Sequence, residues 1–91
     1  MKQYRLDFTN IKSAADMHAV IARACGFPEH YGANLDALWD CLSGDIDTPA
    51  EFIITGREKA EKISAAEALE IFNLLEEYAA GNPDELKLVY R

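Results

Sequence analysis

The chain has 91 residues, 49% of them hydrophobic, and a formal net charge of −7. This length predicts one domain over residues 1–91, and the hydrophobic fraction excludes a disordered chain, which lacks the apolar residues to offset its ordering entropy. The negative charge argues against direct binding of nucleic acid, because phosphates require clustered Lys and Arg. No stretch approaches a membrane span and the first residues lack the apolar run of a signal peptide, so we expect a cytoplasmic protein that binds no membrane.

The acidity is concentrated in the middle of the chain. No Lys or Arg occurs between Arg23 and Arg57. That stretch contains six carboxylates, which are Glu29, Asp36, Asp40, Asp45, Asp47 and Glu51. Six negative charges against none give −6 there and leave −1 for the rest of the chain. One region of the surface is therefore expected to be strongly acidic.

Hydrophobic periodicity and capping residues divide the chain into strands and helices. Ser13, Asn34 and Ser64 are suitable N-caps that precede apolar stripes at helical spacing. In chain order the pattern predicts a strand over 3–8, a helix over 13–25, a helix over 34–43, a strand over 52–55, a short helical turn over 57–63, a helix over 64–80 and a strand over 86–90.

The three predicted strands differ in their polar faces. The first and last alternate apolar and polar residues, as edge strands do, whereas Phe52, Ile53 and Ile54 form an unbroken run that is typical of a strand covered on both faces. The β-α-α-β-α-β order favours a parallel sheet with right-handed crossovers. We therefore predict an α/β fold in which a three-stranded parallel sheet packs with about four helices and residues 52–55 form the central strand.

Motifs typical of an enzyme are absent, because no glycine-rich phosphate loop, dinucleotide fingerprint, HExxH or GxSxG occurs. His18 lies on a predicted helix without a neighbouring nucleophile, which favours a surface or packing role. Cys25 and Cys41 lie sixteen residues apart without a CxxC pair, so we expect both to be reduced and half-buried rather than part of a disulfide or metal site. We expect neither a cofactor nor a metal.

The predicted helix over 34–43 has two faces. Its buried stripe is expected to consist of Leu35, Leu38, Trp39 and Leu42, with Trp39 packed largely inward. Asp36 and Asp40 are four residues apart and share the exposed face. Asp40 is in the last turn, where both the helix dipole and its like-charged neighbour oppose a carboxylate, which points to function. From the residues alone, an ordinary solvated helix face explains the pattern equally well.

A nearly continuous run of residues fills this helix and the loop before it. The run comprises Pro28-Glu29, Tyr31-Gly32 and Asn34-Leu35-Asp36-Ala37-Leu38-Trp39-Asp40-Cys41-Leu42, followed by Gly44. It resembles the signature segment of the barstar family, whose members are intracellular inhibitors of barnase-type ribonucleases. The order of strands and helices is also similar over the whole chain. The resemblance implies a barstar-like fold and a non-enzymatic inhibitor whose partner is a ribonuclease; we expect the free protein to be monomeric.

The resemblance also implies roles for particular residues. The second helix and its preceding loop would plug the active site of the ribonuclease. Asp40 would occupy the place of a substrate phosphate, Asp36 would assist, and His30 would stack on the catalytic histidine of the enzyme. The other residues expected to line the contact are Asn34, Leu35, Ser43, Gly44 and Asp45.

Three positions depart from the family's pattern. His30 replaces a tyrosine, and Asp45 replaces a tryptophan, which removes an aromatic anchor and adds charge. Leu74 aligns with a glutamate of the last helix that contacts the enzyme, although Glu76 and Glu77 lie close behind. We therefore expect the partner to be a related ribonuclease with a somewhat different surface, rather than barnase itself.

Alternatives from other classes remain open to different degrees. An immunity protein against an unrelated basic nuclease toxin would keep the acidic face and change the partner. An acyl-carrier domain needs a serine after the aspartate at the helix start, whereas Ala37 follows Asp36 here. A metal site would have to use Asp36, Asp40, Asp45 and Asp47, which lack the spacing of a calcium loop.

Overall fold

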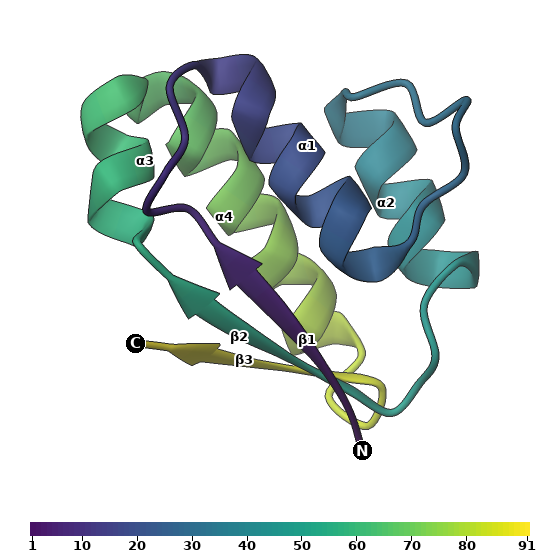
Figure 1. The fold of residues 1–91 in the computed structure, drawn as a ribbon. Helices are drawn as coiled ribbons and strands as arrows, with labels where there is room; N and C mark the ends of the chain where they lie inside the picture. Colours follow the sequence, from purple (N-terminus) through teal and green to yellow (C-terminus); the bar gives the residue numbers. More distant parts are fainter.

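In the computed structural model, which describes residues 1–91, a three-stranded parallel sheet carries four helices on one face (Figure 1). In chain order the elements are β1 (Lys2–Asp7), α1 (Ala14–Cys25), α2 (Leu35–Gly44), β2 (Ala50–Thr55), α3 (Arg57–Ile63), α4 (Ala65–Gly81) and β3 (Leu86–Tyr90). The predicted fold class and element order are confirmed.

The strand order is β1-β2-β3, with both pairs parallel. In the register, Tyr4 on β1 lies opposite Phe52 on β2, which lies opposite Leu88 on β3. β2 is therefore the central strand, as its lack of a polar face predicted. Because neighbouring strands are parallel, each connection must return along a face of the sheet to the edge where the next strand begins. The helices form these crossover connections, all on the same face.

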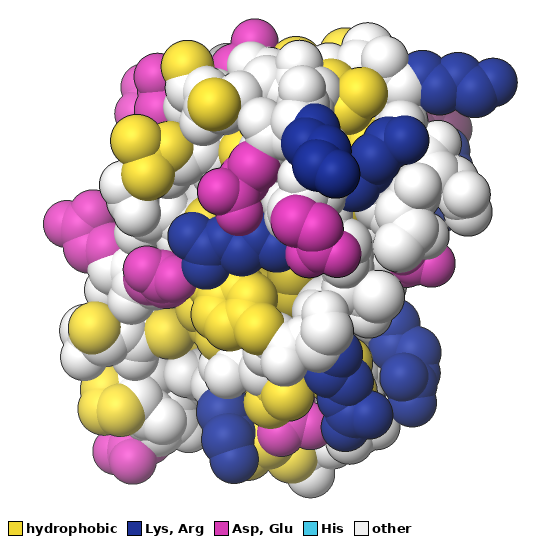
Figure 2. Space-filling view, turned by 90° about the vertical axis from the view of Figure 1, so that its left-hand side faces the viewer, with side chains coloured by type: hydrophobic (Ala, Val, Ile, Leu, Met, Phe, Trp, Pro, Cys, Tyr) yellow, Lys and Arg dark blue, Asp and Glu magenta, His cyan; other side chains and the backbone are white.

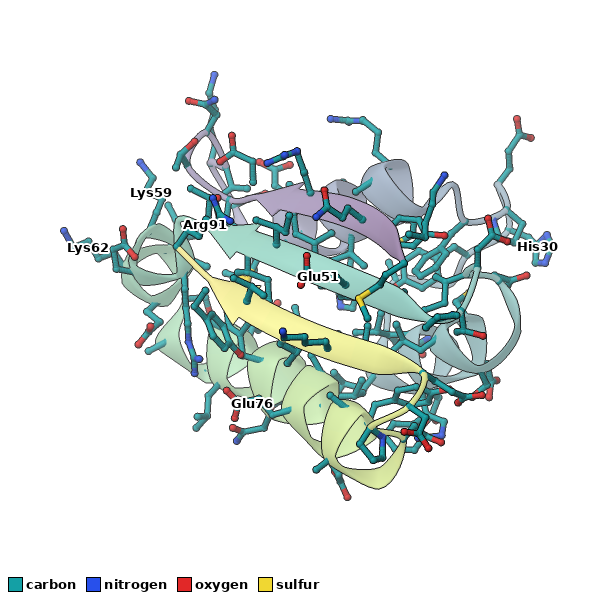
Figure 3. The ribbon with its side chains drawn as sticks, turned by 90° about the horizontal axis from the view of Figure 1, so that it is seen from below. His30, Glu51, Lys59, Lys62, Glu76 and Arg91 are labelled. Atoms are coloured by element: carbon teal, nitrogen blue, oxygen red, sulfur yellow. The ribbon has the colours of Figure 1, made fainter.

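The side chains of β2 are covered on both faces of the sheet, as predicted, although the helices lie on one face only and leave the second face open (Figure 3). Phe52 and Ile54 belong to the core, whereas Ile53 alternates to the open face and is still only 3% exposed. Its register partners are Arg5 and Val89. The apolar run thus reflects cover by side chains of the neighbouring strands rather than a second layer of helices.

The helices begin where the capping residues predict. Ser13 and Asp16 form a capping box at the start of α1, and the Ser64 hydroxyl accepts a hydrogen bond from the backbone N–H of Glu67 at the start of α4. Phe8 and Phe72 are fully buried and meet edge to face at 5.4 Å between ring centroids. None of the helices combines the length and apolar character needed to cross a membrane.

The position of α2 is the feature of the fold that matters most for the site. α2 lies on one side of the helical layer and α3 on the other (Figure 1). α2 packs mainly against α4, and its fully buried Leu38 and Leu42 belong to the core cluster. One face of α2 is thereby fixed to the core, and the opposite face is free to meet a partner.

Gly56 joins β2 to α3 and should be essential for stability. Its φ is +80°, and a Cβ there would lie 2.8 Å from the Thr9 backbone nitrogen. Gly56→Ala should therefore lower the free energy of unfolding by about 2–4 kcal/mol, combining left-handed strain with the clash. Urea denaturation measures this. Gly26→Ala is the matched control, because Gly26 also has a positive φ of 69° but nothing within 4 Å of the added Cβ. The free energy of unfolding of this variant should fall by only about 1–2 kcal/mol. Equal losses would contradict the close contact at Gly56.

Candidate functional site

The exposed side of α2 carries the row of side chains that we call the acidic face, made of Asp36, Asp40 and Ser43. All three are exposed. Asn34 starts the helix, and its Oδ1 accepts a hydrogen bond from the Ala37 backbone N–H at 2.8 Å. The Ser43 hydroxyl donates to the Trp39 carbonyl at 3.0 Å. The structure therefore brings Asp36 and Asp40 onto one exposed face, as predicted, and holds them on a capped helix.

The carboxylates of the acidic face have no cationic partner within the chain. Both salt bridges of the protein are made by Arg57, to Glu61 and Glu76, on the α3 side of the molecule. The side of the molecule seen in Figure 2 mixes Lys and Arg with Asp and Glu around apolar patches. The acidic face instead belongs to the part of the chain without Lys or Arg, so its negative potential is available to a cationic partner.

Negative charge continues at the C-terminal end of α2. No basic residue lies in the last turn, and the Asp45 backbone N–H caps the helix by donating to the Cys41 carbonyl at 2.7 Å. Burial raises the pKa of the Cys41 thiol to about 11, and the nearby carboxylates of Asp45 and Asp40 add to this effect. The thiol therefore stays protonated, and the helix end is a concentrated negative site, because the dipole has the same sign as these carboxylates.

Trp39 does not pack largely inward, so that expectation is wrong. The residue is 38% exposed. Its ring stands edge-on against Tyr78 of α4 at a centroid distance of 4.9 Å, at the flank of α2 between the buried stripe and the acidic face. Cys41, on the other flank, is buried instead. The sequence pattern could not distinguish the two flanks, because their burial depends on how α4 approaches α2.

Tyr78 fixes α2 to α4 by two contacts. Its ring meets Trp39, and its buried hydroxyl donates to the Leu42 carbonyl at 3.3 Å. Leu42 lies in the last turn of α2, where backbone carbonyls lack partners within the helix. The hydrogen bond thus satisfies one of these carbonyls and fixes the position of the last turn of α2 relative to α4.

Glu76 is not placed to assist the acidic face, whereas Glu77 remains available. Glu76 Oε1 accepts hydrogen bonds from Arg57 at 3.1 Å and from the Tyr90 hydroxyl at 2.8 Å, and it lies far from His30 (Figure 3). Leu74 is half-buried against the core. Glu77 is three residues from Leu74 and therefore shares its edge of α4.

A second acidic edge of α4 was missed in the sequence. Glu67 and Glu70 line a shallow hollow together with Asn34 and Leu35 at the start of α2. Their spacing from Leu74, seven and four residues, is the signal that could have identified them, because it places all three on one edge of the helix. This edge extends the negative surface beyond α2.

The loop before α2 presents His30 to solvent, as expected of a contact residue. His30 is exposed and points away from the sheet (Figure 3). The neighbouring Tyr31 turns inward, and its hydroxyl lies 2.6 Å from Nδ1 of His18 on α1. His18 is 9% exposed, which confirms its predicted packing role. Leu35 is half-buried and belongs partly to the core, while Gly44 and Asp45 are exposed.

Comparison with known proteins identifies relatives of the chain. The family model described as "Barstar (barnase inhibitor)" matches residues 1–91. A Bacillus subtilis (strain 168) protein named "Putative ribonuclease inhibitor YrdF" is 32% identical over 83 residues, which cover 91% of this chain and 88% of that protein.

The exposure of Trp39 predicts a modest role in stability. Trp39→Ala should lower the free energy of unfolding by only about 1–2 kcal/mol, because part of the side chain is already in water and the substitution removes its packing on Tyr78. Leu38→Ala, which truncates a fully buried neighbour, should cost about 2–5 kcal/mol. Chemical denaturation of both variants makes the comparison. A larger loss for Trp39→Ala than for Leu38→Ala would contradict the observed placement.

His18 should make stability depend on pH in a defined direction. Burial lowers the pKa of His18 below its ordinary value of 6.5, and the charge of Glu67 only partly opposes this. The folded protein therefore binds fewer protons at His18 than the unfolded chain, so the stability it contributes is lost as pH falls below about 6.5. His18→Gln removes this titration. Urea denaturation at about pH 7.5 and about pH 5 should show a smaller decrease for the variant than for the wild type. Equal decreases would refute the assignment.

Proposed function

The chain belongs to the barstar family of protein inhibitors of barnase-type ribonucleases, and we propose that it inhibits such an enzyme by inserting the acidic face of α2 into the enzyme's cationic active site. The family consists of inhibitors rather than enzymes, which confirms that the chain is not an enzyme. The observation that carries the proposed mechanism is the pair of unpaired carboxylates, Asp36 and Asp40, on the exposed side of a helix that is anchored on its other side.

The mechanism follows from what a ribonuclease must offer its substrate. An enzyme that binds RNA presents cationic groups to the phosphates. In the proposed complex Asp40 occupies the position of a phosphate, and Asp36, one turn earlier, adds a second charge. Because α2 is capped by Asn34 and held by Tyr78, the carboxylates are already oriented and little conformational entropy is lost on binding. The surrounding negative potential would speed association at low salt.

Gly44 supports a close contact at the end of α2. A Cβ added to Gly44 would meet no atom within 4 Å, and its φ is not among the positive values. The fold of the free protein therefore does not require glycine here. A partner backbone or side chain that packs directly on the helix end does favour glycine, since any Cβ would hold it away.

The remaining surface of the proposed contact combines the loop and the neighbouring helix. His30 and Asn34 lie at the start of α2, Leu35 contributes its exposed part, and Ser43 and Asp45 lie at the end. Glu77, on the adjoining edge of α4, would take the place of the family's helix-four glutamate. We place this inhibition in the cytoplasm, where the buried free thiols of the protein would remain reduced.

An immunity protein against an unrelated basic nuclease is the second candidate, because the same unpaired acidic face would suit any cationic nuclease site. The two functions differ in the enzyme that is inhibited. A barnase-type ribonuclease assayed on RNA, beside structurally unrelated basic nucleases assayed on their own substrates, separates them. Inhibition of an unrelated nuclease alone would favour the immunity protein.

Asp40→Ala should separate binding from folding. In the free protein Asp40 opposes the helix dipole and lies one turn from Asp36, so its removal should leave the melting temperature unchanged or slightly higher. In the complex the enzyme's cationic groups would lose their partner in a desolvated pocket, which should weaken inhibition by about 3–5 kcal/mol, a hundredfold or more. Melting temperature and inhibition of a barnase-type ribonuclease are measured on the same sample.

Glu58→Ala provides the matched control. Glu58 is an exposed carboxylate on α3, on the side of the molecule away from α2, and the substitution changes the net charge equally. Inhibition by Glu58→Ala should stay close to that of the wild type. If Asp40→Ala inhibits as strongly as Glu58→Ala, the acidic face is not the inhibitory surface.

A further inference from the structure

The loop from Gly26 to Asn34 is connected to the rest of the fold by very few polar contacts. Within the loop, the Tyr31 backbone N–H donates to the Pro28 carbonyl at 2.9 Å, and Asn34 Nδ2 donates to the Gly32 carbonyl at 3.4 Å. Among the hydrogen bonds made by residues 28–33, only that between Tyr31 and His18 reaches another helix. This bond is therefore the polar contact that holds the loop on α1, in addition to the packing of Phe27 and Tyr31 against the core.

The bond is short and shielded. Tyr31 Oη lies 2.6 Å from His18 Nδ1, and the two rings are 5.8 Å apart between centroids. The Tyr31 ring also packs on Phe27 at 5.1 Å, so one side chain joins the start of the loop to α1. His18 is 9% exposed, which means that water cannot easily replace the tyrosine as its partner.

The groups around this bond favour a neutral histidine that accepts a hydrogen bond from the Tyr31 hydroxyl. Burial lowers the pKa of His18 and raises the pKa of Tyr31 to about 12. Tyr31 therefore keeps its hydroxyl proton and can donate a hydrogen bond to Nδ1. The charged groups near His18 are Glu67 and Glu70 of α4, and no Lys or Arg of the chain lines that hollow.

We propose that His18 is a positioning residue of the inhibitory surface: through Tyr31 it fixes the α1–α2 loop, and thereby His30, beside the acidic face. This inference rests on the proposed function, because it assigns the loop a role in binding the ribonuclease. His18 is only 9% exposed, at the edge of the hollow that it lines with Asn34 and Leu35, and its proposed role is exerted through Tyr31. Its effect is to order the loop before binding, so that this ordering does not have to occur in the complex.

Tyr31→Phe tests the inference, since it removes the hydroxyl and keeps the ring packed on Phe27. In the free protein, hydrogen exchange of the Tyr31 backbone amide, measured by NMR, should accelerate about three- to tenfold. Dissociation from a barnase-type ribonuclease should accelerate by a similar factor of about three to ten. His18→Gln, whose amide cannot reach the position of Nδ1, should produce the same two changes.

Tyr90→Phe is the matched control. The Tyr90 hydroxyl donates to Glu76 at 2.8 Å, on the α3 side of the molecule and away from the loop. Like Tyr31→Phe, the Tyr90→Phe substitution removes one hydrogen-bonded hydroxyl. Its Tyr31 amide exchange and its dissociation rate should both match those of the wild type. If Tyr90→Phe changes the dissociation rate as much as Tyr31→Phe, general stability explains the result and the inference is wrong.

A double-mutant cycle with His30→Ala distinguishes positioning from stability. If Tyr31 positions His30, then His30→Ala should weaken binding less in the Tyr31→Phe background than in the wild type. Additive effects would overturn the inference. If the wild-type protein inhibits no barnase-type ribonuclease, the proposed function fails, and unchanged amide exchange in Tyr31→Phe would overturn the positioning role independently.

Discussion

The hydrophobic contact between α2 and α4 supports a helix whose exposed side works against its own stability. Leu38 and Leu42 are fully buried, and Tyr78 adds a hydrogen bond to the backbone of the last turn. Against this, Asp40 and Asp45 are carboxylates at the negative end of a helix dipole, and Asp40 has no ion-pair partner in the chain. Each carboxylate costs only a fraction of a kcal/mol at an exposed site, which is much less than two buried leucines contribute. The fold can therefore keep an acidic surface unpaired.

Most of the fold could be predicted because its signals are local. Caps at Ser13, Asn34 and Ser64 and apolar periodicity located the helices, and the lack of a polar face identified β2 as the central strand. The apolar run does not say what covers the second face: Ile53 lies between Arg5 and Val89 in the register, and a single sequence does not distinguish such lateral cover from a second layer of helices. Parallel pairing follows from the helical connections between the strands, which the order of the elements along the chain contains.

The site was predictable where one helix defines it and unpredictable where two elements meet. Asp36 and Asp40 share a face because of their spacing, so the acidic face follows from the sequence. The exposure of Trp39 does not, because both flanks of α2 carry apolar residues and only the approach of α4 decides which is buried. Likewise, sequence proximity favoured Glu76 and Glu77 equally. Only the three-dimensional contacts show that Glu76 is engaged by Arg57 and Tyr90.

The aspartate at position 45 changes the kind of partner surface that fits the end of α2. A tryptophan there would require an apolar groove on the enzyme, whereas a carboxylate requires a hydrogen-bond donor or a cation, since burying it unpaired is costly. Asp45 and Asp47 line a hollow with Lys2, Arg5 and Arg23, so the chain already offsets part of this charge on the side facing β1. Asp36 and Asp40 have no such neighbours. The strongest attraction for a cation therefore lies on the acidic face, and Asp45 acts at its border, where it disfavours enzymes with an apolar rim and favours those with a polar or basic one.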